Sequence, residues 1–153
     1  MGGHQSSPNN ILSSYRANHY ILRKIQKQEE SLQIALSNYI KLQYPKVVFT
    51  SESSGIRVSM GTAVKMKRQR SVHTQLDMFI AEPRGGYHGL FIELKKNRDA
   101  VYSKRDGSYL QNKHIKDQLA TIEILQEKGY EAVFGCGFDE CQNIVDNYMA
   151  ISI

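Results

Sequence analysis

The 153-residue sequence predicts a single α/β domain in which helices flank a mixed β-sheet. Two predicted strands, 76–80 and 87–95, are separated by a Pro-Arg-Gly-Gly turn, which is typical of an antiparallel hairpin. A helix predicted at about 112–128 lies between this hairpin and a further strand at 130–135. A strand reached through a helical crossover normally runs parallel to the strand before it, so both kinds of strand pairing are expected.

The N-terminal third is predicted to form a polar arm, a long helix and a strand. Residues 1–13 are expected to be a disordered arm, because its first ten residues are mostly Gly, Ser, Pro and Asn. From Ser14 to Lys41 apolar side chains recur at alternating steps of three and four, which indicates an amphipathic helix. Pro45 ends this region, and the β-branched stretch 46–50 predicts a strand.

The remaining segments differ in how clearly they can be assigned. Residues 61–74 show no clean period, so they are expected to be either a short helix or a mobile loop that becomes ordered on nucleic acid. Residues 96–112 are mostly polar and predict a long connection. Gly129 is the expected stop of the 112–128 helix, and 139–150 predicts a closing helix with Ile144, Val145 and Tyr148 inward.

The bulk composition fits one soluble globular domain. Hydrophobic residues make up 41% and charged residues 23% of the chain, and no apolar run reaches the ~18 residues that a membrane helix requires. The first twenty residues lack the apolar stretch of a signal peptide, so a cytoplasmic location is expected. Cys136 and Cys141 are expected to be buried structural residues without a disulfide.

The net charge of +5 favours a polyanionic partner. One short stretch ahead of the hairpin contains five cations and no acidic residue between them. From charge alone, a solvent-exposed loop without a binding role explains such a stretch equally well. The stretch directly precedes the hairpin, whose acidic residues form a candidate metal site. Contact with DNA phosphates is therefore the better interpretation. The candidate DNA-binding residues are Arg57, Lys65, Lys67, Arg68 and Arg70.

The hairpin brings two acidic residues and a lysine together. A turn centred near Gly85 places Asp77 opposite Glu93, where Cβ atoms are about 5 Å apart and bare carboxylates repel each other. Glu93 and Lys95 share one face of their strand because side chains alternate. A divalent cation would remove the repulsion, and Mg²⁺ prefers carboxylate oxygens together with water and phosphate. The pair therefore predicts a Mg²⁺ site, in which Mn²⁺ is expected to substitute.

Two helices each contribute a polar candidate on an inward face. Glu29 occupies a position where the helical stripe calls for an apolar residue, and Glu30 lies at the edge of that stripe. Either acid could also be an ordinary solvent-facing residue. Gln118 shares the inward face of its helix with Ile115 and Ile122. Backbone groups could satisfy a buried glutamine, so a structural role and a site role both stay open from spacing alone.

The order of these residues resembles the VRR-NUC family of the PD-(D/E)XK nucleases, in its bacteriophage form. The stretch from Pro83 to Lys95 contains the Glu-x-Lys element and follows Asp77 at the matching spacing. Gln118 precedes a Gly-Tyr pair, as in that family, and the run Glu-Glu-Ser-Leu-Gln at 29–33 reproduces an acid one turn before a glutamine. The resemblance covers roughly residues 28–148. The chain has His-Thr-Gln-Leu at 73–76, where relatives often have a Gly-x-Pro turn before the aspartate.

The resemblance implies a fold, an activity and a set of site residues. The fold is a restriction-endonuclease-like αβββαβ core within residues 14–153. The activity is metal-dependent hydrolysis of DNA phosphodiester bonds, either by nicking or by structure-selective cutting of substrates such as junctions. A homodimer and a helicase or other replication or recombination partner are compatible with it. The implied catalytic residues are Asp77, Glu93, Lys95, Glu29 and Gln118.

The resemblance also assigns the metal ligands. They are Asp77, Glu93 and the backbone carbonyl of Leu94, with either Glu29 or Glu30 as the helix acid. Lys95 is expected to hold the attacking water or stabilise charge, and Lys96 joins the DNA-binding residues. The alternative is a non-catalytic basic nucleic-acid-binding module, in which Glu93 and Lys95 form an exposed ion pair on an edge strand.

Overall fold

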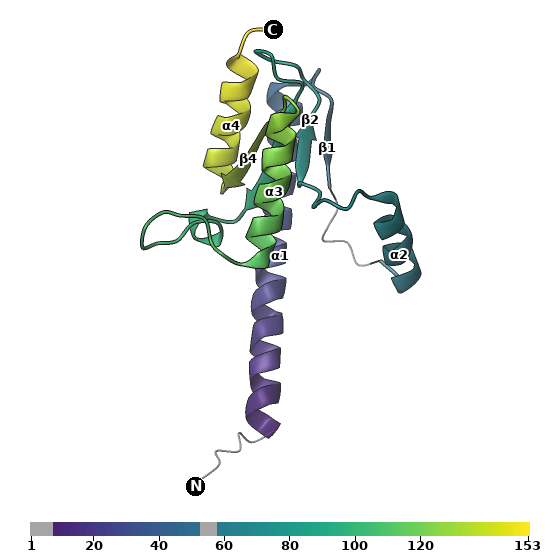
Figure 1. The fold of residues 1–153 in the computed structure, drawn as a ribbon, viewed down its shortest axis with the longest axis vertical. Coiled ribbons are helices and arrows are strands. Elements are labelled where there is room, and N and C mark those ends of the chain that lie inside the picture. Colours follow the sequence, from purple (N-terminus) through teal and green to yellow (C-terminus); the bar gives the residue numbers. More distant parts are fainter. Residues whose placement is uncertain (1–7, 53–57) are drawn as a thin grey trace.

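The computed structural model describes residues 8–52 and 58–153, and Figure 1 shows their arrangement. Within these residues a four-stranded sheet has the strand order β1-β2-β3-β4. The strands are β1 (Phe49–Ser51), β2 (Met78–Ile80), β3 (Leu90–Lys95) and β4 (Glu131–Cys136). The α-helices are α1 (Pro8–Gln43), α2 (Met60–Gln69), α3 (Lys113–Glu127) and α4 (Phe138–Ala150), and a 3₁₀ turn spans Arg98–Ala100.

The sheet is mixed, as the sequence predicts. β1, β2 and β3 pair antiparallel, whereas β4 pairs parallel with β3 after the α3 crossover. The register pairs Met78 with Ile92, which places position 77 opposite position 93 and confirms the predicted alignment. Gly85 and Gly86 turn the chain between β2 and β3 with φ of 54° and 91°, a conformation that glycine adopts without steric cost.

Helices cover both faces of the sheet. α1 and α4 pack on one face, against alternate side chains of β2 and β3 that include Met78, Ile92 and Leu94. α3 packs on the other face, mainly against β4, where Ile115 and Ile122 lie close to Phe134. In Figure 1 the N-terminal half of α1 extends well beyond the sheet. The αβββαβ order and the mixed, helix-flanked sheet are therefore confirmed.

A polar contact joins α1 to α4 beside the apolar core. The Asp146 carboxylate accepts hydrogen bonds from the Tyr39 hydroxyl at 2.7 and 2.8 Å and from the Tyr44 hydroxyl at 2.7 Å. Tyr39 also meets Phe138 edge to face, with ring centroids 6.1 Å apart. This contact fixes the C-terminal half of α1 against the sheet, which is the half that contributes to the site described below.

Four local expectations need adjustment. α1 begins at Pro8, within the stretch expected to be a disordered arm, and Pro is well suited to a first helical turn because its missing N–H would have no intrahelical partner. Residues 1–7 lie outside the described residues. β1 starts at Phe49 instead of residue 46, because a turn closes from Val47 N–H to the Tyr44 carbonyl. β2 spans only Met78–Ile80, without Leu76 and Asp77, and β3 starts at Leu90 instead of residue 87.

The ambiguous segment after β1 contains α2. Ser59 caps this helix by accepting a hydrogen bond from Thr62 N–H at 3.2 Å. No residue of α2 is buried, which explains why no apolar period marked it in the sequence. In Figure 1 α2 stands out to one side of the domain.

Two smaller expectations can also be compared with the structure. Cys136 and Cys141 are both buried and unbonded to each other, as predicted. None of the described helices combines the length and the apolar character needed to cross a membrane.

Candidate active site

The site forms where β2 begins and β3 ends. Asp77 immediately precedes β2, and its Oδ2 accepts a hydrogen bond from the Leu94 backbone N–H at 2.8 Å. Glu93 and Lys95, both on β3, are only 3% and 4% exposed. Lys95 Nζ lies 2.9 Å from Glu93 Oε1. The predicted acids and lysine are thus brought together on the face of the sheet that α3 covers.

The Glu93–Lys95 pair differs from the exposed edge-strand pair of the alternative interpretation. β3 lies between β2 and β4, so it is an internal strand, and both side chains are buried. Burying two charges costs desolvation energy that an exposed pair avoids. The exposed ion pair of the alternative interpretation, which would contribute little stability, therefore does not match this buried pair.

Gln118 reaches the same point from α3. Asn112 caps that helix by accepting from Ile115 N–H at 2.9 Å, and the cap fixes where the first turns lie over β3. Gln118 is 2% exposed, and its Nε2 donates a hydrogen bond to Glu93 Oε1. Glu93 Oε2 and Gln118 Oε1 are buried and receive no hydrogen bond from the described residues. Two acceptor oxygens therefore lack a partner at the centre of the site.

The C-terminal half of α1 closes the site from another side. Glu29 is half-buried and lines the cavity, whereas Glu30 is exposed and does not line it. One turn further on, Gln33 Nε2 donates to the backbone carbonyls of Glu52 at 2.7 Å and Asp77 at 3.2 Å. The Glu52 N–H also donates to the Asp77 carbonyl at 2.7 Å. Gln33 thus joins α1 to the two chain segments that lead into and out of the α2 region.

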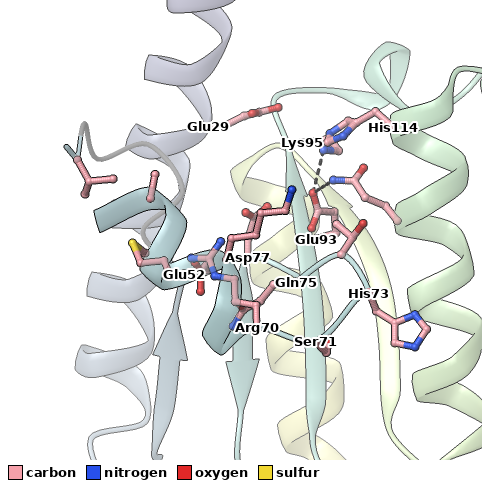
Figure 2. A pocket seen from close by; sticks show the side chains of 16 residues that line it. Glu29, Glu52, Arg70, Ser71, His73, Gln75, Asp77, Glu93, Lys95 and His114 are labelled. Carbon is pink, nitrogen blue, oxygen red and sulfur yellow. Dashed lines mark hydrogen bonds and ion pairs between the residues drawn. The ribbon is translucent and has the colours of Figure 1, made fainter. Parts of the chain in front are cut away.

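These residues face an open cavity of about 590 Å³. Figure 2 shows Asp77, Glu93 and Lys95 close together on its wall, with His114 beside Lys95 and Glu29 further away. α2 and the segment after it form the opposite wall. The lining residues are Glu29, Glu52, Val58, Ala63, Met66, Lys67, Arg70, Ser71, His73, Thr74, Gln75, Asp77, Glu93, Lys95, His114 and Gln118.

Burial raises the pKa values of the acids of this cavity, and the Asp77 carboxylate adds to this effect at Glu93 and Glu29. Burial, followed by the nearby Asp77 carboxylate, raises the pKa of Glu93 to about 8, although Lys95 acts in the opposite direction. Burial also raises the pKa of Asp77, against the hydrogen bond from Leu94 and the charge of Lys95. The pKa of Glu29 is raised by burial too. Without a cation, ionising these carboxyl groups in the folded protein therefore costs free energy.

The donor atoms fit a hard divalent cation. Asp77 and Glu93 provide two opposed carboxylates, and Oε2 of Glu93 has no hydrogen-bond partner among the described residues. Carboxylate oxygens are ligands of the kind that Mg²⁺ and Mn²⁺ accept. Among the described residues no group of three or more His, Cys, Asp and Glu side chains converges as a metal cluster. A cation here would therefore bind through two carboxylates, with backbone or water oxygens completing its coordination.

The candidate DNA-binding residues divide into three groups. Lys67 and Arg70 line the cavity, and Arg70 forms an ion pair with Glu52. Lys65 and Arg68 are exposed on α2, and Lys96 is half-buried directly after β3. Arg57 lies outside the described residues.

Three titratable cavity residues were not anticipated from the sequence. His114 lies one helical turn before Gln118, and that spacing is a signal that could have identified it. Burial and the charge of Lys95 lower the pKa of His114. Glu52 and His73 lie in segments without periodicity, so no pattern pointed to them.

Comparison with known proteins finds similarity to a solved structure. No protein-family model matches the chain, and no curated protein matches it significantly. A solved structure described as a "VRR_NUC domain protein" is 26% identical, with a TM-score of 0.59, and the match covers 82% of this chain and 90% of that one. The fold and this match indicate a nuclease-like mixed α/β domain. More particularly, the chain is similar to a solved protein that is named for the VRR_NUC domain.

Proposed function

We propose that this protein is a metal-dependent DNA endonuclease of the PD-(D/E)XK superfamily. The observation that carries the proposal is the buried, opposed pair Asp77 and Glu93, with Lys95 beside it and an unpartnered Glu93 oxygen on the wall of an open cavity. Buried acids with raised pKa values in a cleft are typical of functional sites. The solved VRR_NUC relative supports the same class of protein.

The residues of the chain have distinct tasks in this proposal. Asp77, Glu93 and the Leu94 carbonyl would hold Mg²⁺ or Mn²⁺, which would supply activation of water and charge compensation at a phosphate. Gln118 orients Glu93 through its hydrogen bond, so that the other carboxylate oxygen stays free. The Lys95 ammonium, next to Glu93, stabilises negative charge that develops on the scissile phosphate. Glu29 lines the same cavity and binds further water or a second cation, and its position favours it over Glu30.

Basic residues of α2 and the end of β3 bind the DNA backbone. Lys67 reaches the cavity wall opposite the carboxylates, where a phosphate near the scissile bond would lie. Arg70 contributes once it exchanges its ion pair with Glu52 for a phosphate. The further contacts are Arg57, Lys65, Arg68 and Lys96. We propose nicking or structure-selective cutting, with junctions among the substrates, by a phage-type enzyme in the cytoplasm of a host cell.

Partners follow from the same activity. A homodimer would supply two sites for the two strands of a duplex or junction. A helicase or other replication or recombination protein is a further candidate partner. Light scattering at micromolar concentration tests the dimer, and a purely monomeric protein would exclude it at that concentration.

The experiment that tests the activity uses supercoiled plasmid and a labelled four-way junction. Wild type is compared with Glu93→Ala and Lys95→Ala, and with two exposed α3-side controls, Glu123→Ala and Lys128→Ala. We expect cutting that needs Mg²⁺ or Mn²⁺, disappears in both site variants and persists in both controls. Equal cutting of linear and branched DNA would refute structure selectivity. Salt-sensitive DNA binding without any cutting would instead support a non-catalytic binding module.

A further inference from the structure

The connection between β3 and α3 forms an ordered hairpin, which we call the hairpin arm (residues 101–110). Tyr102 and Tyr109 face each other as a bridge, and backbone hydrogen bonds join Ser103 N–H to Ser108 O at 2.7 Å and Leu110 N–H to Val101 O at 2.8 Å. The two tyrosine rings stack with centroids 5.2 Å apart. The sequence predicted only a long polar connection here, so this order is unexpected.

The base of the hairpin arm is held as well. The Arg98 guanidinium lies 4.7 Å from the centroid of the Tyr102 ring and 3.0 Å from Glu140 Oε2 of α4. Val101 is fully buried in the core under α3. An arm that is anchored by packing and stacking can present its tip in a fixed position, which lowers the entropy cost of using that tip to bind a ligand.

The tip presents two cations to solvent. The Lys104 and Arg105 side chains are 78% and 90% exposed. Their acidic neighbours, Asp99 at 2.9 Å and Asp106 at 3.6 Å, are themselves about half exposed. Exposed ion pairs of this kind contribute little and exchange readily for another anion. The tip is therefore available to a polyanion.

The position of the arm relates it to the cavity. In Figure 1 the hairpin arm and α2 project to opposite sides of the domain, and the N-terminal turn of α3 lies between them. His114, in that turn, lines the cavity. α2 has four cationic side chains in and directly after it and no acid, whereas α4 has three acids and no cation. α2 is thus cationic, and the hairpin arm adds the exposed Lys104 and Arg105, each beside an acid.

We propose that the hairpin arm is a second binding surface for the phosphate backbone of duplex DNA. A duplex whose scissile bond enters the cavity would contact α2 on one side and Lys104 and Arg105 on the other. This deepens the proposed nuclease function and depends on it for the identity of the polyanion. A duplex too short to reach both projections cannot contact the arm, so the contribution of the arm to DNA affinity depends on duplex length.

The test is metal-free DNA binding by Lys104→Ala/Arg105→Ala, measured by fluorescence anisotropy in EDTA. A series of duplexes of increasing length is titrated at several salt concentrations. We expect weaker binding of long duplexes, unchanged binding of the shortest ones, and a slope of log affinity against log salt that is shallower by about one to two. The matched control is Lys41→Ala/Lys46→Ala, which removes two exposed cations in and just after the last turn of α1 and should leave both quantities unchanged.

Three outcomes would overturn the inference. They are an unchanged affinity for long duplexes, an equal loss in the control variant, and a loss that is the same at every duplex length. Plasmid cleavage by the wild type is measured in parallel. An absence of cleavage would count against the proposed nuclease function, while the length-dependent binding result, obtained without metal, still decides whether the hairpin arm binds DNA. Thermal melts check that both double variants fold, which is expected because the substituted positions are exposed.

Discussion

Relative to the wild type, the metal-free Glu93→Gln variant should become progressively more stable as pH rises, even though the substitution should abolish activity. The folded-state pKa of Glu93 is raised from 4.5 to about 8, mainly by burial and by the Asp77 carboxylate. Between these two pH values the folded protein holds a proton that the unfolded chain has released. The free energy of unfolding of the wild type therefore falls as pH rises through this window. Glutamine resembles the protonated acid and has no such dependence.

The magnitude follows from linkage. A single group held protonated only in the folded state lowers the free energy of unfolding by about 1.4 kcal/mol per pH unit, and over this window by at most about 5 kcal/mol. Relative to Glu93→Gln, the wild type should lose stability from about pH 4.5 and reach a plateau above pH 8. Glu123→Gln, at an exposed position on α3, should track the wild type throughout.

The assay is urea unfolding in EDTA at several pH values, followed by the same series with Mn²⁺. At pH 8 Mn²⁺ should stabilise the wild type by about 2.7 kcal/mol when its concentration is 100 times the dissociation constant, and Glu93→Gln should lose this gain. A stability difference between the two proteins that stays flat with pH would refute the reasoning. It would mean that Glu93 is ionised throughout and that its pair with Lys95 outweighs both burial and Asp77.

Three further changes have distinct expected results. Gln33→Ala removes both hydrogen bonds to the Glu52 and Asp77 carbonyls, so kcat should fall by more than tenfold with little loss of DNA affinity, while the exposed α1 control Gln43→Ala should be neutral. Equal kinetics for these two variants would exclude a positioning role for Gln33. Asp146→Ala takes the acceptor from its two tyrosine donors and should lower Tm by several degrees with kcat unchanged, which differential scanning calorimetry and a cleavage assay can separate. Chelation with EDTA should lower the Tm of metal-loaded wild type but leave that of Glu93→Gln unchanged, and a shift in both would place the metal elsewhere.

The hairpin and its acids could be predicted because local chemistry fixes them. Two consecutive glycines permit positive φ at both central positions of the turn, and the turn then sets the register that opposes Asp77 to Glu93. Alternation along β3 next decides which side chains share a face. Helical spacing likewise predicted that Gln118 faces inward, whereas its role in the site was implied only by the family resemblance. These features depend on short-range geometry that one sequence contains.

Other features of the site depend on tertiary contacts that leave no pattern. Gln33 binds backbone carbonyls, which every residue has, so its partners could not be read from residue types. α2 buries nothing and therefore shows no apolar period. The choice between Glu29 and Glu30 needed the rotation of α1 over the sheet, which places only Glu29 at the cavity. The order of the hairpin arm depends on Tyr102 and Tyr109, whose pairing across a polar loop is not evident from spacing.

The most direct test of the central claim is cleavage of supercoiled plasmid by wild type and Glu93→Gln, each in Mg²⁺ and in EDTA. Both proteins should fold and bind the plasmid, so cutting reports on the metal site alone. The account predicts nicked or linear product only from the wild type in Mg²⁺. Cutting by Glu93→Gln at the wild-type rate, or cutting that persists in EDTA, would contradict the assignment of Asp77 and Glu93 as the metal-binding pair of a nuclease.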